Sequence, residues 1–384
     1  MKEIKVVIGA NYGDEGKGLM SRHFCLDAKQ KNMNPIVIMS NGTAQRGHTV
    51  DYSDDFCHVY HHFGSGTADG VPTFYSNDFL LHPMEFVREY KELAAAGITP
   101  IVYCDPKAKV ITPFDMLVDH ATEAHIARLK GEREYGSCGF GSWCATDRFK
   151  HLVYTIEDFM NPRIVPILMN NVWSACIAQL IERKVDVEQL PEFAHYFEVN
   201  SPTKVNAIRH FEDDLRFFIT HVTDWVSYDK VYDLFDYNVF ENGQGLGLDQ
   251  NVDNEWHTTS NTGVLNAYEL LKDKKGFTAE ACYVSRSYLT RHGEGPLEEA
   301  VKKSEINEDM VDKTNVPNEF QGSLRYGYLE DKDQKNRIEK DSSIIVSDNR
   351  FVTSMCITHC NEFADIKGNS KYFSDSKFIV KERI

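Results

Sequence analysis

A glycine-rich turn near the start of the chain combines residues that bind phosphate with a carboxylate. Residues 9–18 read GANYGDEGKG and directly follow the apolar run IKVVI. Glycines let main-chain N–H groups approach a phosphate, and Lys17 adds a positive charge. Asp14 lies among these donors, where a carboxylate suits a magnesium ligand, a general base, or both. The competing interpretation is an ordinary glycine turn after a strand.

The spacing of this turn differs from that of a Walker A loop. A Walker A loop has four residues between its first glycine and the Gly-Lys pair, and Ser or Thr after the lysine. Here Asn11 stands in place of that first glycine, and Gly18 follows Lys17. The turn therefore indicates a different kind of phosphate site, and a Walker-type GTPase switch is disfavoured.

Two later glycine turns carry further polar residues. NGTAQRGHTV (41–50) places His48 after a glycine, although a lone histidine is more often structural than catalytic. Residues 240–261 place Gln244 in a third glycine turn and a Thr-Thr-Ser cluster at 258–260. Because open α/β sheets bind ligands at the carboxyl ends of their strands, three such junctions predict one shared site.

Short apolar runs alternate with a helical pattern over the first hundred residues. Residues 4–10, 34–40 and 99–105 are rich in β-branched residues and nearly continuously apolar, which predicts buried strands. Residues 84–97 have apolar side chains at helical spacing and end in glycine, which predicts a helix. Strands that alternate with helices favour an α/β fold with a mainly parallel sheet.

The rest of the chain continues this organisation. Residues 151–235 favour helices, 237–249 repeat the strand-then-glycine pattern, and 302–340 favour charged loops and exposed helix. SSIIVSDN (342–349) and FVTSMCIT (351–358) predict late strands. The sequence contains no internal repeat or low-complexity linker, so we expect one elaborated domain over residues 1–384.

The composition is that of a globular protein and disfavours two classes of partner. Lys and Arg total 42 against 58 for Asp and Glu, so the net charge is −16. That balance argues against binding nucleic acid or an anionic membrane. The nine cysteines lack zinc-ribbon spacing, and no run of about eighteen apolar residues predicts a membrane span. We expect reduced thiols and a cytoplasmic location, which for a viral protein is the host cytoplasm.

The order of these motifs resembles the adenylosuccinate synthetase family. The matching segments are GDEGKG (13–18), GHTV (47–50), the G-x-G turn in YGSCGFG (135–141), FENGQG with the later TSN (240–261), TRHGEGP (290–296) and GYLED (327–331). They span nearly the whole chain in the same order as in the family. The resemblance implies an adenylosuccinate-synthetase-like α/β fold, with a large, mainly parallel central sheet flanked by helices.

The resemblance also implies a two-step carbon–nitrogen ligase of purine biosynthesis. A nucleoside triphosphate phosphorylates O6 of a 6-oxopurine nucleotide, and the amino group of L-aspartate then displaces that phosphate at C6. Asp14 matches the family's base, which also binds Mg²⁺, and His48 matches the residue that stabilises the transferring phosphoryl group. The carbonyl of Gly47 matches a second metal ligand. The matching triphosphate-binding positions are Glu15, Gly16, Lys17, Gly18, Gly47 and Thr49.

At the acceptor nucleotide, the chain keeps some family residues and replaces others. Gln244 and Thr259 match residues that hold the nucleotide. Gln45 replaces a phosphate-binding asparagine, and Ser137 replaces a threonine that contacts the acceptor phosphate. The family forms homodimers in which an arginine arrives from the partner subunit, and Arg148 is the nearest candidate for it. We therefore expect a homodimer.

The family's arginine-rich loop for aspartate is reduced in this chain. The corresponding segment is NEFQGSLRYG (318–327), in which Arg325 is the single arginine. Losing fork-shaped donors for carboxylates weakens the case for aspartate binding unless the loop solves the problem differently. Arg325 is the candidate aspartate-binding residue.

The segment that reads guanine in the family has also changed. A T-K-x-D motif is replaced by Thr358-His359-Cys360-Asn361. An amide both donates and accepts, so Asn361 can pair with an adenine edge. We favour ATP or dATP over GTP as phosphoryl donor. The alternative is drift at a site that still uses GTP.

A shortened chain without the guanine reader is similar to the phage branch of the family. That branch joins aspartate to dGMP on the route to 2-aminoadenine, and it often has serine at the Asp14 position. We favour dGMP as acceptor, with N6-succino-2-amino-2'-deoxyadenylate as product. An ordinary GTP-dependent enzyme acting on IMP remains the alternative, and a catalytically inactive nucleotide-binding protein is a further one.

Overall fold

The computed structural model describes residues 1–131, 138–253, 256–297, 299–310, 322–329, 331–363 and 370–383. Its centre is a ten-stranded sheet in which every neighbouring pair is parallel except β14 and β15. In spatial order the strands are β15 (Lys381–Glu382), β14 (Tyr372–Phe373), β13 (Phe351–Thr358), β9 (Phe277–Arg286), β1 (Lys2–Gly9), β8 (Tyr237–Glu241), β2 (Pro35–Met39), β5 (Thr73–Tyr75), β6 (Val102–Cys104) and β7 (Asp224–Trp225). The expected mainly parallel α/β fold is confirmed.

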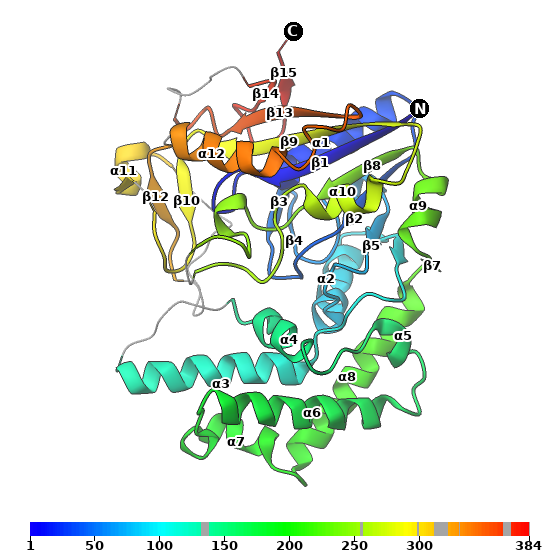
Figure 1. Cartoon of the computed structure of the whole chain (residues 1–384), viewed down its shortest axis with the longest axis vertical. Coiled ribbons are helices and arrows are strands. Elements are labelled where there is room, and N and C mark those ends of the chain that lie inside the picture. The colour runs from blue at the N-terminus through cyan, green and yellow to red at the C-terminus, as the bar shows by residue number, and fades with distance from the viewer. Residues whose placement is uncertain are drawn as a thin grey trace.

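Two small antiparallel sheets and a set of helices complete the described structure. The small sheets contain β10 (Leu289–Arg291), β12 (Arg325–Gly327) and β11 (Ala300–Val301), and β3 (His48–Asp51) with β4 (Cys57–Tyr60). The helices are α1 (Lys17–Gln30), α2 (Pro83–Ala95), α3 (Pro113–Lys130), α4 (Ser142–Arg148), α5 (Ile156–Phe159), α6 (Val165–Glu182), α7 (Pro191–Phe197), α8 (Pro202–His221), α9 (Tyr228–Leu234), α10 (Leu265–Leu271), α11 (Lys303–Ile306) and α12 (Asp331–Ser342), with 3-10 turns η1 (Thr67–Asp69), η2 (Val187–Gln189) and η3 (Leu246–Leu248). Helices α3, α6, α7 and α8 form a helical body below the sheet in Figure 1.

The central strands β1, β8 and β2 are largely buried because both faces of the sheet are covered there. On β1, Val7 packs into one hydrophobic core with Val37 of β2, whereas Val6 and Ile8 pack into a second core on the opposite face. Successive side chains of a strand point to opposite faces, so a strand buried on both sides needs apolar residues at every position. This explains the continuous apolar runs of the sequence.

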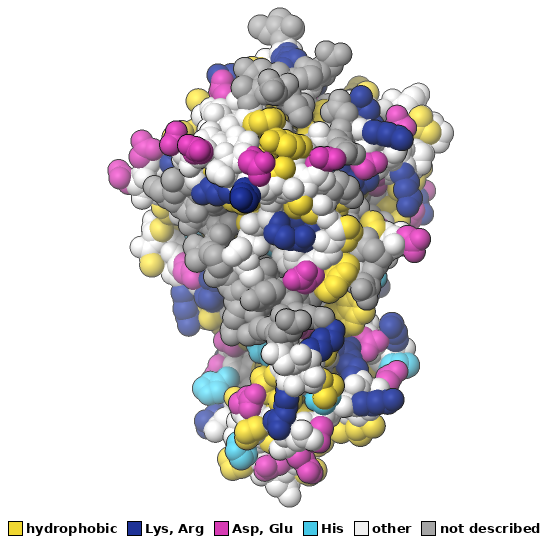
Figure 2. All heavy atoms as spheres, turned by 90° about the vertical axis from the view of Figure 1, so that its left-hand side faces the viewer, with side chains coloured by type: hydrophobic (Ala, Val, Ile, Leu, Met, Phe, Trp, Pro, Cys, Tyr) yellow, Lys and Arg dark blue, Asp and Glu magenta, His cyan; other side chains and the backbone are white. Residues whose placement is uncertain are grey.

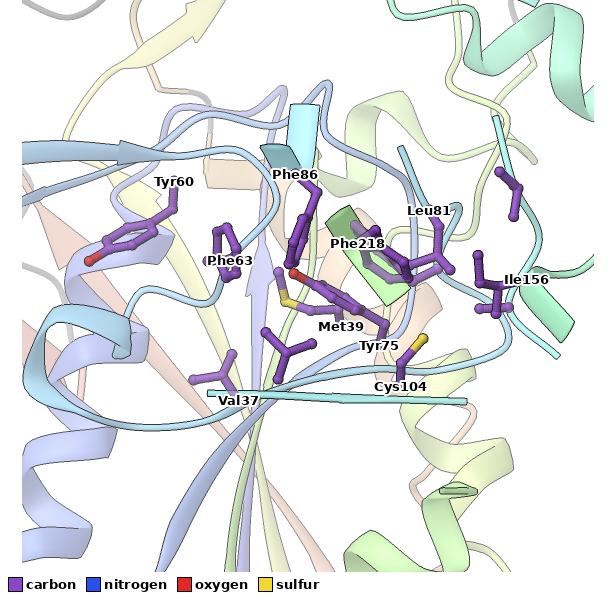
Figure 3. Close-up of a cluster of buried hydrophobic side chains, with 14 of the residues drawn as sticks. Val37, Met39, Tyr60, Phe63, Tyr75, Leu81, Phe86, Cys104, Ile156 and Phe218 are labelled. Carbon is purple, nitrogen blue, oxygen red and sulfur yellow. The ribbon is translucent and has the colours of Figure 1, made fainter. Parts of the chain in front are cut away.

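Aromatic packing joins the helices to one face of the sheet. Figure 3 shows Tyr75 of β5 beside Phe86 of α2 and Phe218 of α8. The rings of Phe86 and Phe218 meet edge to face, with centroids 4.7 Å apart and an interplanar angle of 80°. Such pairs add about 0.5–1.5 kcal/mol to the stabilisation from burial alone. This core therefore sets where the helical body lies relative to the sheet.

Most of the predicted elements are confirmed, and one is wrong. Residues 4–10, 34–40, 99–105 and 351–358 contribute to β1, β2, β6 and β13, and 84–97 to α2. SSIIVSDN is instead the end of α12 followed by turns. Ile345 is only 2% exposed, whereas Val346 is 82% exposed. A single turn buries the isoleucine beside Phe351 without a strand partner, so local β-propensity was a poor guide.

Surface charge and hydropathy give two further observations. Figure 2 shows lysines and arginines intermixed with aspartates and glutamates on one face, without a continuous basic area among its described atoms. No helix in the described part of the chain combines the length and apolar character that crossing a membrane requires.

Candidate active site

The parallel sheet brings the predicted site residues to one edge. Strands β1, β8, β2 and β13 end at the same edge, because β1 pairs in parallel with β8 and β9, and these pair in parallel with β2 and β13. The GDEGKG loop follows β1, Gln244 follows β8, and Asn361 follows β13. Segments that are more than two hundred residues apart in sequence thus meet at the carboxyl ends of the strands.

Glu15 organises the GDEGKG loop from inside. Its carboxylate is 2% exposed and accepts hydrogen bonds from the main-chain N–H of Asn11 at 3.1 Å and of Gly13 at 2.8 Å. The ammonium of Lys17 donates to the same carboxylate at 2.6 Å. A buried carboxylate requires such partners. Contact between Glu15 and a triphosphate would therefore come from its main chain.

Close packing explains the departures from a Walker A loop. A Cβ atom on Gly18 would lie 2.9 Å from the carbonyl oxygen of Thr49 and 3.1 Å from Cβ of His48, so α1 approaches β3 too closely for a side chain. The side chain of Asn11 is buried, donates to Ser285 Oγ at 2.9 Å and accepts from Arg337 of α12 at 2.7 Å. Asn11 therefore connects the loop to its neighbours, where a glycine has no side chain to do so.

Asp14 is held in an unusual backbone conformation and contacts a histidine. Its φ is 58°, a left-handed value that is uncommon for a residue with a side chain. Its carbonyl accepts from Nε of Arg286, and its carboxylate lies 3.3 Å from Nε2 of His292. His292 follows β10 and was not among the predicted site residues. Its position in the TRHGEGP motif was the one signal that pointed to it.

His48 forms a buried pair with a second unpredicted residue, Glu241. Nδ1 of His48 lies 2.5 Å from Oε1 of Glu241, which also accepts from the hydroxyl of Ser65 at 2.9 Å. Burial lowers the pKa of His48 to about 4, although Glu241 acts in the opposite direction. Burial opposes ionisation of Glu241, but His48, Arg46 and Ser65 outweigh it and hold the pKa of its carboxyl well below the usual value.

The protonation state of this pair follows from those shifts. A neutral His48 donates its Nδ1 proton to an ionised Glu241, as in other carboxylate–histidine pairs. The Nε2 atom of His48 is buried without a hydrogen-bond partner in the described chain. An unpartnered buried nitrogen is costly, and a ligand that supplies a hydrogen bond removes that cost.

A cavity of about 370 Å³ lies between the helical body and the sheet. Its walls come from α3, α4 and the loops after β8 and β10, and Gln45, Gln244, Thr259 and His292 line it. Gln45 donates to Thr258 Oγ1 at 3.3 Å and accepts from Ser142 Oγ at 2.6 Å. The predicted acceptor residues Gln45, Gln244 and Thr259 therefore share one cavity, and His292 connects it to Asp14.

The surroundings of Arg148 contradict the prediction that it binds the acceptor nucleotide. It is 1% exposed and forms a two-pronged ion pair with Asp115, with Nε and Nη2 each 2.8 Å from a carboxylate oxygen. Two further hydrogen bonds reach the carbonyls of Val110 and Leu152. Four of its donor contacts are thus used inside the chain, and it does not line the cavity. Arg148 joins α3 to α4 and is not placed to bind the acceptor nucleotide.

The remaining predicted residues lie in different surroundings. Ser137 falls outside the described residues. Arg325 on β12 donates to the carbonyls of Gly293 at 2.7 Å and Gly295 at 2.9 Å, in the loop that borders the cavity. Asn361 is exposed in the turn after β13, three residues beyond Thr358, whose hydroxyl donates to the carbonyl of Glu15 at 2.7 Å.

The two oxygens predicted from the sequence to bind a metal, the Asp14 carboxylate and the Gly47 carbonyl, suit magnesium better than a transition metal. The described residues contain no cluster of three or more His, Cys, Asp or Glu side chains suited to hold a metal. Mg²⁺ is commonly held by one or two protein oxygens together with waters and substrate phosphates. The partly exposed carboxylate of Asp14 and the exposed Gly47 provide oxygens of that kind.

Comparisons of the sequence with known proteins match it to members of one family. The sequence profile of the adenylosuccinate synthetase family matches residues 6–330. Over 302 residues the chain is 25% identical to the adenylosuccinate synthetase of Clostridium botulinum (strain Alaska E43 / Type E3), covering 76% of this chain and 64% of the relative. It is also 25% identical to that of Thermosipho africanus (strain TCF52B), covering 76% and 65%. The chain thus spans slightly less than two thirds of the length of these relatives.

Two solved structures share the fold. The fully ligated adenylosuccinate synthetase of Plasmodium falciparum has a TM-score of 0.62 at 17% identity, covering 93% of this chain and 77% of that one. The succinoaminodeoxyadenylate synthetase of cyanophage S-2L, solved with dGMP and with dATP as energy donor, has a TM-score of 0.60 at 13% identity, covering 100% and 95%.

We predict that Arg148 stabilises the fold. Arg148→Met leaves the Asp115 carboxylate buried without a cation and should lower the free energy of unfolding by about 3–5 kcal/mol, as measured by urea denaturation. The double variant Asp115→Asn/Arg148→Met removes that charge and should recover part of the loss. Arg209→Met, on the exposed face of α8, is the matched control. An equal effect of Arg148→Met and Arg209→Met would contradict the prediction.

We also predict that His48 stays neutral across the physiological range. Because burial lowers its pKa to about 4, its imidazole signals should remain constant from pH 8 to pH 5.5 in NMR spectra of protein with labelled histidine. His48→Gln assigns the signal by its loss. A titration midpoint above pH 6 would show that Glu241 outweighs burial.

Proposed function

The chain belongs to the adenylosuccinate synthetase family, and from this we propose that it is a carbon–nitrogen ligase that joins L-aspartate to C6 of a 6-oxopurine nucleotide. We propose dGMP as acceptor and ATP or dATP as phosphoryl donor. The observation that supports this proposal most directly is that Gln45, Gln244 and Thr259 line the same cavity as His292. His292 in turn contacts Asp14. A nucleotide bound in that cavity would have its purine within reach of Asp14, the proposed general base.

The proposed reaction has two balanced steps. Asp14 takes the N1 proton of the acceptor, and O6 attacks the γ-phosphorus of the triphosphate. The O6–P bond forms, the bond to the β–γ bridging oxygen breaks, and the nucleoside diphosphate leaves with that electron pair. The amino group of aspartate then bonds to C6, the C6–O6 bond breaks, and phosphate leaves. The products are the succinylated nucleotide, nucleoside diphosphate, phosphate and protons.

His48 and the GDEGKG loop would stabilise the charge that moves in the first step. His48 donates through Nδ1 to Glu241, so its unpartnered Nε2 atom would be available to a ligand as a single, oriented contact. An approaching phosphoryl group is anionic and would raise the pKa of His48, which favours a charged donor at Nε2. Lys17 lies at the first turn of α1, where main-chain N–H groups also favour a phosphate. When bound at Asp14 and Gly47, Mg²⁺ would neutralise triphosphate charge.

Arg325 is the proposed contact for the carboxylate of aspartate. Its Nη2 atom is used by the carbonyls of the 293–295 loop, but its buried Nε–H lacks a hydrogen-bond partner in the described chain. A carboxylate would satisfy that donor. We further propose a homodimer in the cytoplasm, by analogy with the family.

Asn361 supports the choice of an adenine donor. It follows β13, and the hydroxyl of Thr358 at the end of that strand donates to the carbonyl of Glu15 in the GDEGKG loop, so the amide of Asn361 would lie near the proposed triphosphate site. An amide can donate to N1 and accept from N6 of adenine, whereas an aspartate there would repel the N1 acceptor. The cyanophage enzyme that shares the fold was solved with dGMP and dATP.

The second candidate is the ordinary reaction, in which IMP and GTP are the substrates. The carboxylate of Asp14 favours it, because the phage branch often has serine there. A catalytically inactive binding protein is the third candidate, and the retained set of Asp14, Lys17, His48 and Gln244 disfavours it.

We predict phosphate release with dGMP, L-aspartate, Mg²⁺ and either ATP or dATP. The assay crosses dGMP, GMP and IMP against ATP, dATP and GTP, and Asp14→Asn, which removes the base, should lose at least about 100-fold in kcat. Turnover of IMP with GTP alone would replace the proposal with the ordinary reaction. Absence of turnover in every combination, with intact nucleotide binding, would support the inactive protein.

We predict that Asn361→Asp changes the choice of donor. The carboxylate accepts from the N1–H and exocyclic amine of guanine but repels N1 of adenine, so kcat/KM should shift toward GTP relative to ATP by about 10-fold or more. Asn361→Ala, the matched control, should weaken both donors without reversing their order. An unchanged ratio in Asn361→Asp would remove Asn361 from the donor site.

A further inference from the structure

The 5'-phosphate of the acceptor nucleotide requires a cation, and the predicted one is engaged elsewhere. The guanidinium of Arg148 forms an ion pair with the carboxylate of Asp115 in the interior of the protein. Among the described residues that line the 370 Å³ cavity, the permanently charged cations are Arg183 and Arg291. The inference below rests on the proposed function, because it concerns the nucleotide that this cavity would hold.

Arg291 is already committed to the protein. It is 1% exposed, and its guanidinium donates to the carbonyls of Glu294 at 3.0 Å, Pro296 at 3.0 Å and Trp256 at 3.2 Å. It also lies over the ring of Tyr12, 4.9 Å from the centroid. Moving Arg291 toward a phosphate would release three loop carbonyls from their donor. Its contacts indicate that Arg291 shapes the cavity wall.

Arg183 has weaker partners and faces the same cavity. It follows the last residue of α6, and its side chain is 19% exposed. It donates to Sγ of Cys144 at 3.1 Å and to a carboxylate oxygen of Asp147 at 3.2 Å. Burial raises the pKa of the Cys144 thiol, so the sulfur is a neutral and weak acceptor. Asp147 is shared with Lys150, which donates to it at 2.8 Å.

Neutral donors that suit a phosphate line the same cavity as Arg183. Ser142 is two residues before Cys144 on α4, and its hydroxyl is bonded to Gln45. Gln45 in turn reaches Thr258, next to Thr259. Amide and hydroxyl groups around one guanidinium are the usual components of a phosphate site.

Acidic residues of the helical body also line the cavity. Asp119 and Glu123 of α3 also line the cavity, and Asp119 accepts from the main-chain N–H of Gly141 at 3.1 Å. In a cavity that also holds carboxylates, a guanidinium favours the binding of a phosphate dianion. We propose that Arg183, from the same subunit, binds the 5'-phosphate of the acceptor nucleotide together with Gln45, Ser142 and Thr259.

The test measures binding of dGMP and of its uncharged counterpart, deoxyguanosine, by isothermal titration calorimetry on the full chain. Arg183→Gln should raise the Kd for dGMP about 10- to 100-fold and leave that for deoxyguanosine unchanged, because the variant loses a charge-assisted contact to phosphate alone. Arg183→Lys keeps the charge without the fork and should fall between the two. Arg216→Gln is the matched control, since that arginine is 71% exposed on α8.

A second variant tests the same contact from the opposite direction. Asp147→Asn removes the carboxylate that competes for Arg183 and should tighten dGMP binding about 2- to 5-fold, which keeps the test decisive if Arg183→Gln does not fold. Two results would overturn the assignment of Arg183 and leave the proposed function standing. One is unchanged affinity for dGMP in both variants. The other is equal weakening of dGMP and deoxyguanosine binding in Arg183→Gln. If the wild-type chain binds neither dGMP nor IMP, the proposed function fails and the assignment with it.

Discussion

The parallel pairing of β1 with β8 and β9 is the constraint on which the site depends. It places the GDEGKG loop between the turn after β8 and the strand that supports β13. Each of these strands is buried on both faces, so a shift of register would move apolar side chains between two separate cores. The hydrophobic cores therefore fix the positions of polar loops that they do not themselves contact.

Buried carboxylates orient polar groups at this edge and inside the helical body. Glu15 holds the N–H groups of the loop and Lys17, Glu241 holds His48, and Asp115 holds Arg148 between α3 and α4. A buried charge is costly, and its removal leaves the partner unpaired, so each pair tolerates few geometries. The site is thus positioned by interactions that lie behind the groups expected to contact ligands.

The separation between the helical body and the sheet gives the cavity its mixed character. The sheet side supplies glycine turns and main-chain donors, while α3, α4 and the end of α6 supply Asp119, Ser142 and Arg183. Aromatic packing between α2, α8 and β5 fixes the position of the helical body relative to the sheet (Figure 3). The same cavity therefore has His292, which contacts Asp14, on its sheet side and charged side chains of the helical body on the other side.

The sequence by itself determined the buried strands, the glycine-rich turn after the first of them and the order of motifs that identify the family. These depend on local properties: apolar runs, glycine content, and spacing within about ten residues. Only the tertiary structure decided the partners of each charge. Arg148, Glu241 and His292 show why, because their partners Asp115, His48 and Asp14 lie 33, 193 and 278 residues away in sequence. Whether an arginine is free for a ligand depends on which distant carboxylate the fold brings to it, and that information is absent from local sequence.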